Sequence, residues 1–285
     1  MKKIKTSLVL EGGGMRGAYT AGALTWLIDQ DIEFDASYGI STGAVHLTNF
    51  LMKSKEDLFD FSVRRITDPR IVGLKPLLHC GKIVDYDFLF DHIMTEECGY
   101  DISPLKDCRE GFIGLYVLSE GRTIYYPTRE ISLKQLEAST SLPILGSIVR
   151  ENGLELMDGG ITDMIPIKQA IVDGCNRHLI ITTKPGNYER KPAKPFVVWL
   201  MKVTYPQCEN ISKDYEVRHL NYQDQIVRIR ELEEKKEAVY VFPSKASNVT
   251  RLGGSEEELT ELFRLGYSDM ENRKEAIFAL LDEDA

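Results

Sequence analysis

Ser41 is the residue of this chain whose surroundings best fit a catalytic nucleophile. It stands in Gly39-Ile40-Ser41-Thr42-Gly43, a G-x-S-x-G pattern between a strand-like run at 36–40 and a helix-like run at 42–53. Glycines fit the tight strand-to-helix turn that pushes such a serine hydroxyl outward, at the positive end of the next helix. The alternative is a helix cap, in which Ser41 or Thr42 only satisfies backbone N–H groups.

A glycine-rich turn near the N-terminus could hold an anion. The letters EGGGMRG at 11–17 follow an apolar run at 7–10 and precede a helix-like run at 18–30. The spacing fits the G-x-G-x-x-G pattern of dinucleotide-binding turns. The same backbone N–H groups could instead stabilise the oxyanion of an acyl-transfer reaction. Arg16 is a candidate contact for a phosphate or carboxylate, with an ordinary ion pair as the alternative.

Asp158 is the carboxylate best placed to serve as a base for that serine. It ends an apolar run at 154–157 and is followed by Gly159 and Gly160, which leave the backbone open to a close approach. A carboxylate at such a position could accept the hydroxyl proton of Ser41. The alternative is a plain turn, because Asp-Gly and Gly-Gly are common there.

The histidines offer no comparable partner for Ser41. They stand at positions 46, 79, 92, 178 and 219, and none lies in a glycine-framed loop. His46 follows Ser41 by five residues in the same predicted helix, so we expect it to point away from the turn. The pattern favours a Ser–Asp dyad over a Ser-His-Asp triad.

The elements that must position these residues alternate between strand-like and helix-like runs, which predicts an α/β fold with a mostly parallel sheet. A hairpin is expected around Gly121, and Ser255 with Glu258 fits a capping box. A loop is expected at 184–195. Strands are predicted at 7–10, 36–40, 111–118, 122–126, 154–157, 177–183 and 239–242, and helices at 18–30, 42–53, 56–66, 85–93, 133–139, 167–173, 214–236 and 255–281.

Composition narrows the class of protein. The chain has 285 residues, 43% of them hydrophobic and 28% charged, which is typical of a globular protein. A net charge of −9 argues against nucleic acid as the main partner. The 5 cysteines are odd in number and form no C-x-x-C pair, so neither a disulfide framework nor a zinc site is expected. The longest apolar run, 196–201, is too short to span a membrane. A cytoplasmic protein is predicted.

Taken together in chain order, the motifs EGGGMRG, GISTG and DGG resemble those of the patatin-like phospholipases. The stretch EASTSLPILGSIV at 137–149 resembles the A-S-x-x-x-P segment of that family. DGGITDMIPI at 158–167 resembles its D-G-G-x-x-x-N-x-P segment, with Met164 in place of the usual asparagine. The C-terminal part resembles a bacterial cytoplasmic branch of the family. The motif-bearing resemblance covers 6–185.

The resemblance implies a three-layer α/β/α fold and a serine lipid acyl hydrolase that cleaves esters of phospholipids or lysophospholipids. It implies Ser41 as the nucleophile and Asp158 as the general base, with no metal and no cofactor. It implies one patatin-like domain over 1–285, with the C-terminal helices and one strand at 186–285 packing on the core. The implied oxyanion hole is formed by the backbone of Gly12, Gly13, Gly14 and Met15, and the supporting glycines are Gly17, Gly39, Gly43, Gly159 and Gly160.

Other functions use the same features. An acylglycerol lipase or a thioesterase could use the same dyad, and a non-enzymatic lipid-binding regulator could keep the fold. A dinucleotide-binding oxidoreductase requires an acidic residue at the end of the second strand, but Glu33 and Asp35 precede the run at 36–40. The expected partners are a lipid ester and, transiently, a membrane surface; no oligomeric state is predicted. The stretch 190–206, with Phe196 and Trp199, could touch lipid, although we expect a core-facing helix there.

Overall fold

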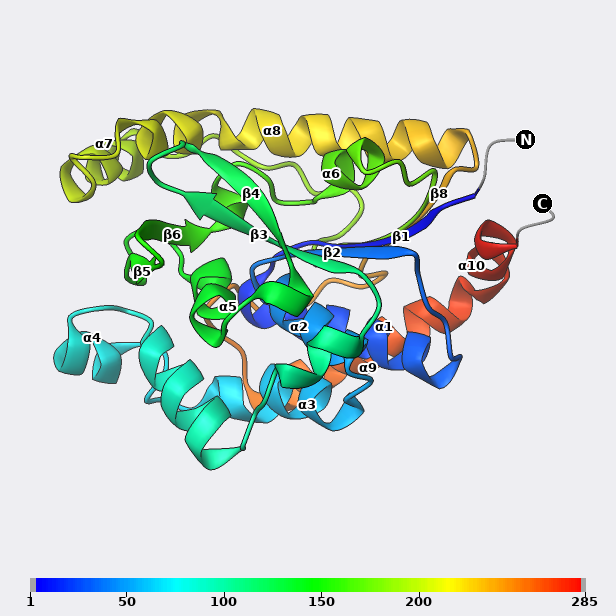
Figure 1. The fold of residues 1–285 in the computed structure, drawn as a ribbon, viewed down its shortest axis with the longest axis horizontal. Helices are drawn as coiled ribbons and strands as arrows, with labels where there is room; N and C mark the ends of the chain where they lie inside the picture. The colour runs from blue at the N-terminus through cyan, green and yellow to red at the C-terminus, as the bar shows by residue number, and fades with distance from the viewer. Residues whose placement is uncertain (1–3, 283–285) are drawn as a thin grey trace.

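A computed structural model of the chain, which describes residues 4–282, shows one twisted sheet between two layers of helices (Figure 1). The sheet order is β5-β6-β3-β2-β1-β7-β8, and β4 pairs with β3 outside this path. The strands are β1 Thr6–Leu10, β2 Ala36–Ile40, β3 Gly111–Val117, β4 Arg122–Pro127, β5 Val149–Glu151, β6 Leu154–Asp158, β7 Arg177–Ile181 and β8 Ala238–Val241.

The helices cover both faces of this sheet. In Figure 1, α6, α7 and α8 lie above it, and α1, α2, α3, α9 and α10 lie below it. The helices are α1 Gly17–Asp29, α2 Thr42–Leu51, α3 Lys55–Phe59, α4 Leu74–Cys80, α5 Leu133–Thr140, α6 Ile167–Val172, α7 Pro195–Thr204, α8 Glu209–Glu234, α9 Glu256–Asn272 and α10 Lys274–Leu281.

The central strands β2, β1, β7 and β8 run parallel to one another, and β3 is parallel to β2. Antiparallel pairing is confined to the edge formed by β3, β4, β5 and β6. A parallel sheet covered on both faces requires apolar side chains on both. In β1, Leu8 and Leu10 pack in the core beside α1, whereas Val9 packs in the core beside α8. The predicted three-layer α/β/α class is confirmed.

Most predicted elements lie within a few residues of their observed bounds, including the hairpin turn at Gly121, the loop after β7 and the capping box at Ser255. Two elements were missed. The three-residue strand β5 is too short to show a period, and α4 carries a proline inside its first turn. The predicted helix 255–281 is two helices, α9 and α10, which meet at Arg273. The predicted helix 85–93 is mainly a π-helical segment, Phe88–Glu97.

The helix expected within 190–206 packs on the core along one side and leaves its other side open to solvent. In α7, Met201 is buried and Val197 packs beside it, whereas Phe196, Trp199 and Val203 are each more than half exposed. Part of the apolar sequence of this stretch therefore lies at the protein surface. The composition alone could not show which apolar residues face outward, because that depends on their positions around the helix.

The C-terminal part of the chain lies close to the N-terminal part. β8 extends the sheet beside β7, and α9 packs along α1. Glycines on both helices permit this approach: a Cβ on Gly22 would lie 1.8 Å from the Phe263 carbonyl oxygen, and one on Gly266 would lie 2.0 Å from that of Tyr19. The Tyr19 hydroxyl also donates to Asp269 on α9, at 3.0 Å. None of the helices between residues 4 and 282 has the length and apolarity that a bilayer crossing requires.

Candidate active site

Ser41 occupies a strained turn between β2 and α2. Its φ of 58° and ψ of −132° lie in a region that residues with a side chain rarely adopt. The flanking glycines are required by close packing: a Cβ on Gly39 would lie 2.6 Å from the Gly43 carbonyl oxygen, and one on Gly43 would lie 2.8 Å from that of Glu11. The turn thus has the strand–serine–helix form of a nucleophile elbow.

Sheet register brings Asp158 to this turn although 117 positions separate the two residues (158 − 41). Ile40 is paired with Gly114 on β3, and the next residue of β3, Leu115, is paired with Asp158 on β6. The chain can pass this closely because a Cβ on Gly159 would lie 2.5 Å from the Gly114 carbonyl oxygen. The end of β6 therefore meets the end of β2 across a single strand.

Asp158 is buried, with 1% of its surface exposed. Its Oδ1 accepts the Gly160 N–H at 2.7 Å. Burial raises the pKa of Asp158 above its ordinary value, and a hydrogen bond from the Ser41 side chain, the Gly160 N–H, and the charges of Arg218 and Arg251 oppose this effect. A carboxylate with a raised pKa is a stronger base than an exposed one.

The glycine-rich turn passes directly over the serine. A Cβ on Gly12 would lie 2.6 Å from Ser41 Cβ, and Gly14 has a φ of +59°, which favours glycine. A Cβ on Gly13 would lie 2.6 Å from Thr183 Oγ1. The turn, the elbow and Asp158 all line one small pocket. The structure thus brings together the predicted site residues from three distant segments.

The amides of the glycine turn are not equally free. The Gly13 N–H donates to Thr42 Oγ1 at 3.1 Å, and the Met15 N–H donates to the Arg251 carbonyl at 3.0 Å. Among the described residues, the Gly12 and Gly14 N–H groups have no such partner. Neither has the Thr42 N–H, which opens α2 and, like the first amides of any helix, has no carbonyl within the helix to bond. The sequence pattern indicated Thr42 as a possible helix cap and not as an oxyanion donor, although the residue after an elbow serine is a common one.

A buried ion pair anchors the start of the glycine turn. Glu11 is fully buried, and its carboxylate accepts the Thr183 N–H at 2.7 Å and the Thr183 hydroxyl at 3.0 Å. It also pairs with the Lys184 ammonium. Burial raises the pKa of Glu11, but Lys184 and Thr183 together outweigh this effect and hold it below its ordinary value. Sequence analysis placed Lys184 in a loop and missed this role.

Replacing Lys184 with methionine is expected to destabilise the protein by about 3–5 kcal/mol, because the Glu11 carboxylate would remain buried without a counter-charge. The double variant Glu11→Gln/Lys184→Met should recover most of this loss. Urea unfolding followed by circular dichroism measures both effects. A double variant as unstable as Lys184→Met would show that the pair is not what holds the turn.

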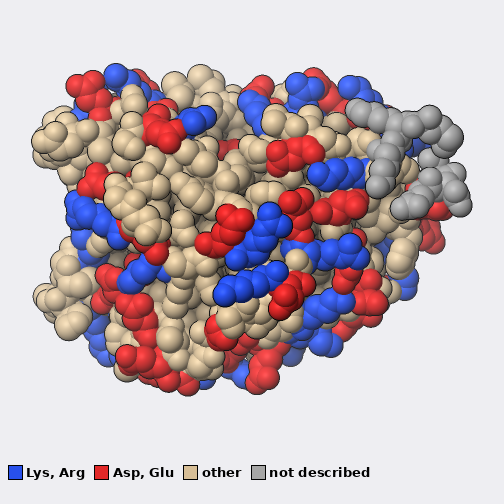
Figure 2. All heavy atoms as spheres, in the orientation of Figure 1, with Lys and Arg blue, Asp and Glu red and all other residues tan. Residues whose placement is uncertain are grey.

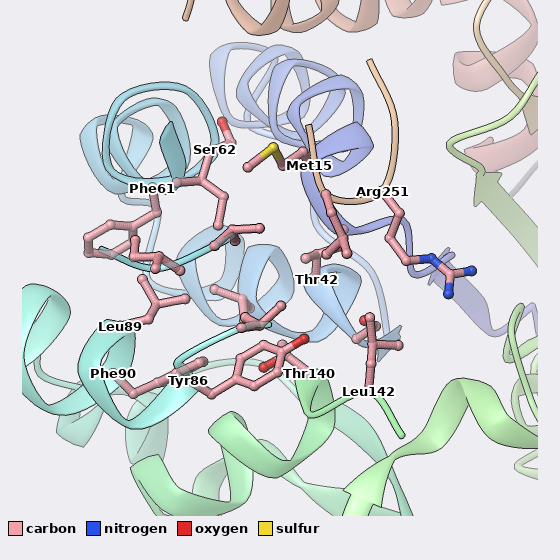
Figure 3. A pocket seen from close by; sticks show the side chains of 18 of the residues that line it. Met15, Thr42, Phe61, Ser62, Tyr86, Leu89, Phe90, Thr140, Leu142 and Arg251 are labelled. Atoms are coloured by element: carbon pink, nitrogen blue, oxygen red, sulfur yellow. The ribbon is translucent and has the colours of Figure 1, made fainter. Parts of the chain in front are cut away.

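An apolar cavity opens on the other side of Ser41 (Figure 3). Its volume is about 780 Å³, including space open to solvent. Figure 3 shows Phe61, Leu89, Phe90 and Tyr86 gathered along one wall and Met15 and Leu142 on others. The remaining lining is also mainly apolar and includes Ala18, Val45, Ile66, Ile71, Val72, Val84, Met94 and Leu252. Such a cavity suits a hydrocarbon chain.

His46 lines this apolar cavity, as Ser41 does, and the expectation that it points away from the turn stays a prediction. Burial lowers the pKa of His46 to about 4, so the ring is neutral at pH 7, and its Nδ1 has no hydrogen-bond partner. Within residues 4–282, no histidine is hydrogen-bonded to Ser41. His178 is bonded to Ser7 at 2.8 Å, and the other three lie at least partly in solvent.

A family model matches the N-terminal part of the chain. Residues 8–114 match the family model described as Patatin-like phospholipase, so the predicted resemblance is confirmed for the segment with the glycine turn and Ser41. Residues 208–282 match a Domain of unknown function (DUF6363). The prediction of one domain over 1–285 stays a prediction.

Two individual proteins are similar over most of the chain. An uncharacterized protein of Escherichia coli (strain K12), YjjU, is 27% identical over 270 residues, which cover 92% of this chain and 75% of that protein. The crystal structure of VipD from Legionella pneumophila aligns with a TM-score of 0.52 at 12% identity, covering 95% of this chain and 66% of that one. At this identity the second likeness shows a shared fold.

Proposed function

We propose, from the patatin-like phospholipase domain that the chain carries at residues 8–114, that this protein is a serine-dependent lipid acyl hydrolase. The observation that carries the proposal is the pairing of Ser41, in its strained turn, with the buried Asp158 beneath a glycine turn. The apolar cavity beside Ser41 adds a place for an acyl chain.

In the proposed reaction, Asp158 accepts the hydroxyl proton as Ser41 Oγ attacks the ester carbonyl. The C–O bond to the lipid alcohol then breaks, the alcohol leaves with a proton from Asp158, and the acyl group stays on Ser41. Water, activated by Asp158, attacks the acyl-enzyme and releases the fatty acid. Burial of Asp158 supports its role as a base, because the raised pKa favours proton transfer to it.

The oxyanion would be held by backbone N–H groups that have no other partner. Of the glycine turn, Gly12 and Gly14 meet this condition, and Thr42 at the start of α2 adds a third donor. The Met15 amide, bonded to Arg251, would serve only after that hydrogen bond breaks. Loss of one such donor lowers turnover by about 10²–10³-fold.

Hydrolysis of a lysophospholipid and of a dissolved ester by the wild-type protein and by Ser41→Ala tests the proposal directly. A non-enzymatic lipid-binding protein would bind these molecules without cleaving them. An acylglycerol lipase or a thioesterase would cleave neutral glycerides or thioesters at least as fast as lysophospholipids.

We further propose that α4 and α7 rest on a lipid surface. Both helices lie at the same end of the long axis of the molecule, where Figure 2 shows uncharged surface gathered at the edge of an otherwise mixed-charge face. Leu74 and Leu78 on α4, and Trp199 on α7, are more than half exposed. The segment with α4 lies between Val72 and Val84, which both line the apolar cavity. The exposed leucines therefore lie on a segment that begins and ends at the wall of the cavity proposed for the acyl chain.

The double variant Leu74→Asp/Leu78→Asp is expected to reduce association with phospholipid vesicles about tenfold or more, because each leucine buried in lipid contributes about 1.5–3 kcal/mol. Cosedimentation with vesicles measures this. Val227→Asp, at an exposed valine on α8, is the matched control. Equal binding by the two variants would contradict the proposed surface.

A further inference from the structure

We propose that the small pocket on the Asp158 side of Ser41 binds a phosphate group of the substrate, so that the enzyme prefers acyl esters that carry a phosphate next to the scissile ester. This inference rests on the proposed hydrolase function and adds the substrate class. The pocket has a volume of about 320 Å³, including space open to solvent, and is lined by Ser41 and Asp158. It adjoins the apolar cavity, with which it shares Gly14, Ser41, Leu142 and Arg251.

Arginines from three separate segments line this pocket, and a fourth, Arg16, lies near two of them. Arg190 comes from the loop before α7, Arg218 from α8, and Arg251 from the loop before α9, and all three line the pocket. Arg16 comes from the glycine turn. Burial lowers the pKa of Arg16; Glu11 opposes this effect, and the charges of Arg251 and Arg190 add to it. The charges of Arg190 and Arg251 thus act on both Arg16 and Arg218.

These arginines lack the carboxylate partners that buried arginines normally have. Within residues 4–282, the ion pair at this site joins Lys184 to Glu11, and none of the four arginines forms one. The Nε atoms of Arg16 and Arg190 are buried and have no hydrogen-bond partner. In a chain with a net charge of −9, this is a local excess of positive charge.

Aromatic rings and a carbonyl hold the arginines in place. The Arg190 guanidinium lies 5.1 Å from the centre of the Tyr222 ring, and that of Arg218 lies 5.1 Å from the centre of the Tyr215 ring. Arg218, with 8% of its surface exposed, donates from Nε to the Gly160 carbonyl. In Figure 3 the Arg251 guanidinium points away from the apolar wall. These contacts orient the guanidinium groups, and the nearby carboxylates of Asp158 and Glu11 offset only part of their charge.

A phosphate is the ligand that these features suit. Guanidinium groups bind phosphate oxygens through two parallel hydrogen bonds, and several positive charges match the double charge of a phosphate monoester. Ser41 lines both the apolar cavity and the arginine pocket. A lysophospholipid whose ester is placed at Ser41 would direct its acyl chain one way and its phosphate the other.

The inference also gives a role to the segment that matches a domain of unknown function. Arg218 and Arg251 both lie within residues 208–282. Two of the four arginines, and the Arg251 carbonyl that accepts the Met15 N–H, therefore lie on a segment outside the patatin-like match. This segment therefore completes the substrate pocket.

The test compares two substrates with the same acyl chain, a monoacylglycerol and its 3-phosphate, both below their critical micelle concentration. We expect wild-type kcat/KM to favour the phosphate by about 10- to 100-fold, the effect of one or two charged hydrogen bonds. In Arg190→Gln/Arg251→Gln this ratio should fall by about tenfold or more, and lysine at the same positions should restore part of it. Arg228→Gln, an exposed arginine on α8, is the matched control and should keep the wild-type ratio.

A second arm separates a lipid phosphate from free phosphate. Inorganic phosphate should inhibit cleavage of the monoacylglycerol competitively in the wild-type protein and much less in the double variant. Inhibition without any preference for the phosphate-bearing lipid would show a free anion site and overturn the inference. So would equal losses on both lipids in the double variant. Failure to cleave any ester, or cleavage by Ser41→Ala, would instead overturn the proposed hydrolase function.

Discussion

Ser41→Ala is expected to lower kcat/KM for ester hydrolysis on the order of 10⁴- to 10⁶-fold, the loss typical of removing a serine nucleophile. The change removes one oxygen from a side chain that is 8% exposed, so the sheet and the cavity should persist. The residual rate would come from binding and from the oxyanion donors alone. Steady-state hydrolysis of a lysophospholipid measures this effect.

Two controls make this result specific to the nucleophile. Ser212→Ala removes a buried hydroxyl on α8 that donates to the Glu209 carbonyl, far from the elbow, and should leave turnover within about threefold. A fluorophosphonate that reacts with activated serines should label the wild-type protein at Ser41 and should not label Ser41→Ala. An alanine variant with more than about a tenth of wild-type turnover would exclude Ser41 as the nucleophile.

Asp158→Asn is expected to lower kcat/KM on the order of 10³- to 10⁵-fold, because the amide cannot accept the hydroxyl proton. The wild-type rate should also fall as the pH drops through the raised pKa of Asp158, since only the carboxylate form is a base. The ordinary pKa of an aspartate is about 3.9. The acidic limb of the wild-type pH profile should therefore lie at a higher pH than this value. The residual activity of Asp158→Asn should lack this limb.

The stability of the same variant provides an independent check. Because burial raises the pKa of Asp158, its negative charge destabilises the folded state, and this penalty is present above the folded pKa. Asp158→Asn should thus raise the free energy of unfolding at pH 7, with a gain that shrinks as the pH falls through that pKa. Activity lost together with stability would point to a damaged fold instead.

Asp163 offers a matched control five positions along the chain. It is a second, partly buried aspartate, hydrogen-bonded to the Tyr125 hydroxyl and to Gln225, and desolvation raises its pKa to about 6. It does not line the pocket beside Ser41. Asp163→Asn should therefore keep most of the activity that Asp158→Asn loses, and an equal loss in both would remove the case for Asp158 as the base.

The local turns of this protein could be predicted from the sequence because glycines stand at positions where the backbone packs too closely to admit a side chain. Gly39 and Gly43 frame the elbow, and Gly159 frames the approach to Asp158, at positions where a Cβ would collide with a backbone oxygen. The apolar runs predicted the sheet for a similar reason, since strands covered on both faces must be apolar throughout. The confirmed α/β/α class follows from these two local signals.

Other features depend on residues that meet only when the whole sheet is assembled. Lys184 finds Glu11 across β1 and β7, and the Arg251 carbonyl reaches the Met15 amide from the far end of the chain. The exposure of Trp199 follows from how α7 lies on its neighbours. A pattern of residue types along the chain contains no such distances.

Arg16 shows where the two kinds of information meet. By itself, the sequence determined that this arginine lies in a turn of exposed amides, where either an ion pair or a bound anion was open. The tertiary structure decided its surroundings: the arginines at 190 and 251, the charge of Glu11, and no carboxylate bonded to Arg16 among the described residues. A turn is specified by neighbours in sequence, whereas the charge around it is the sum of side chains that only packing brings together.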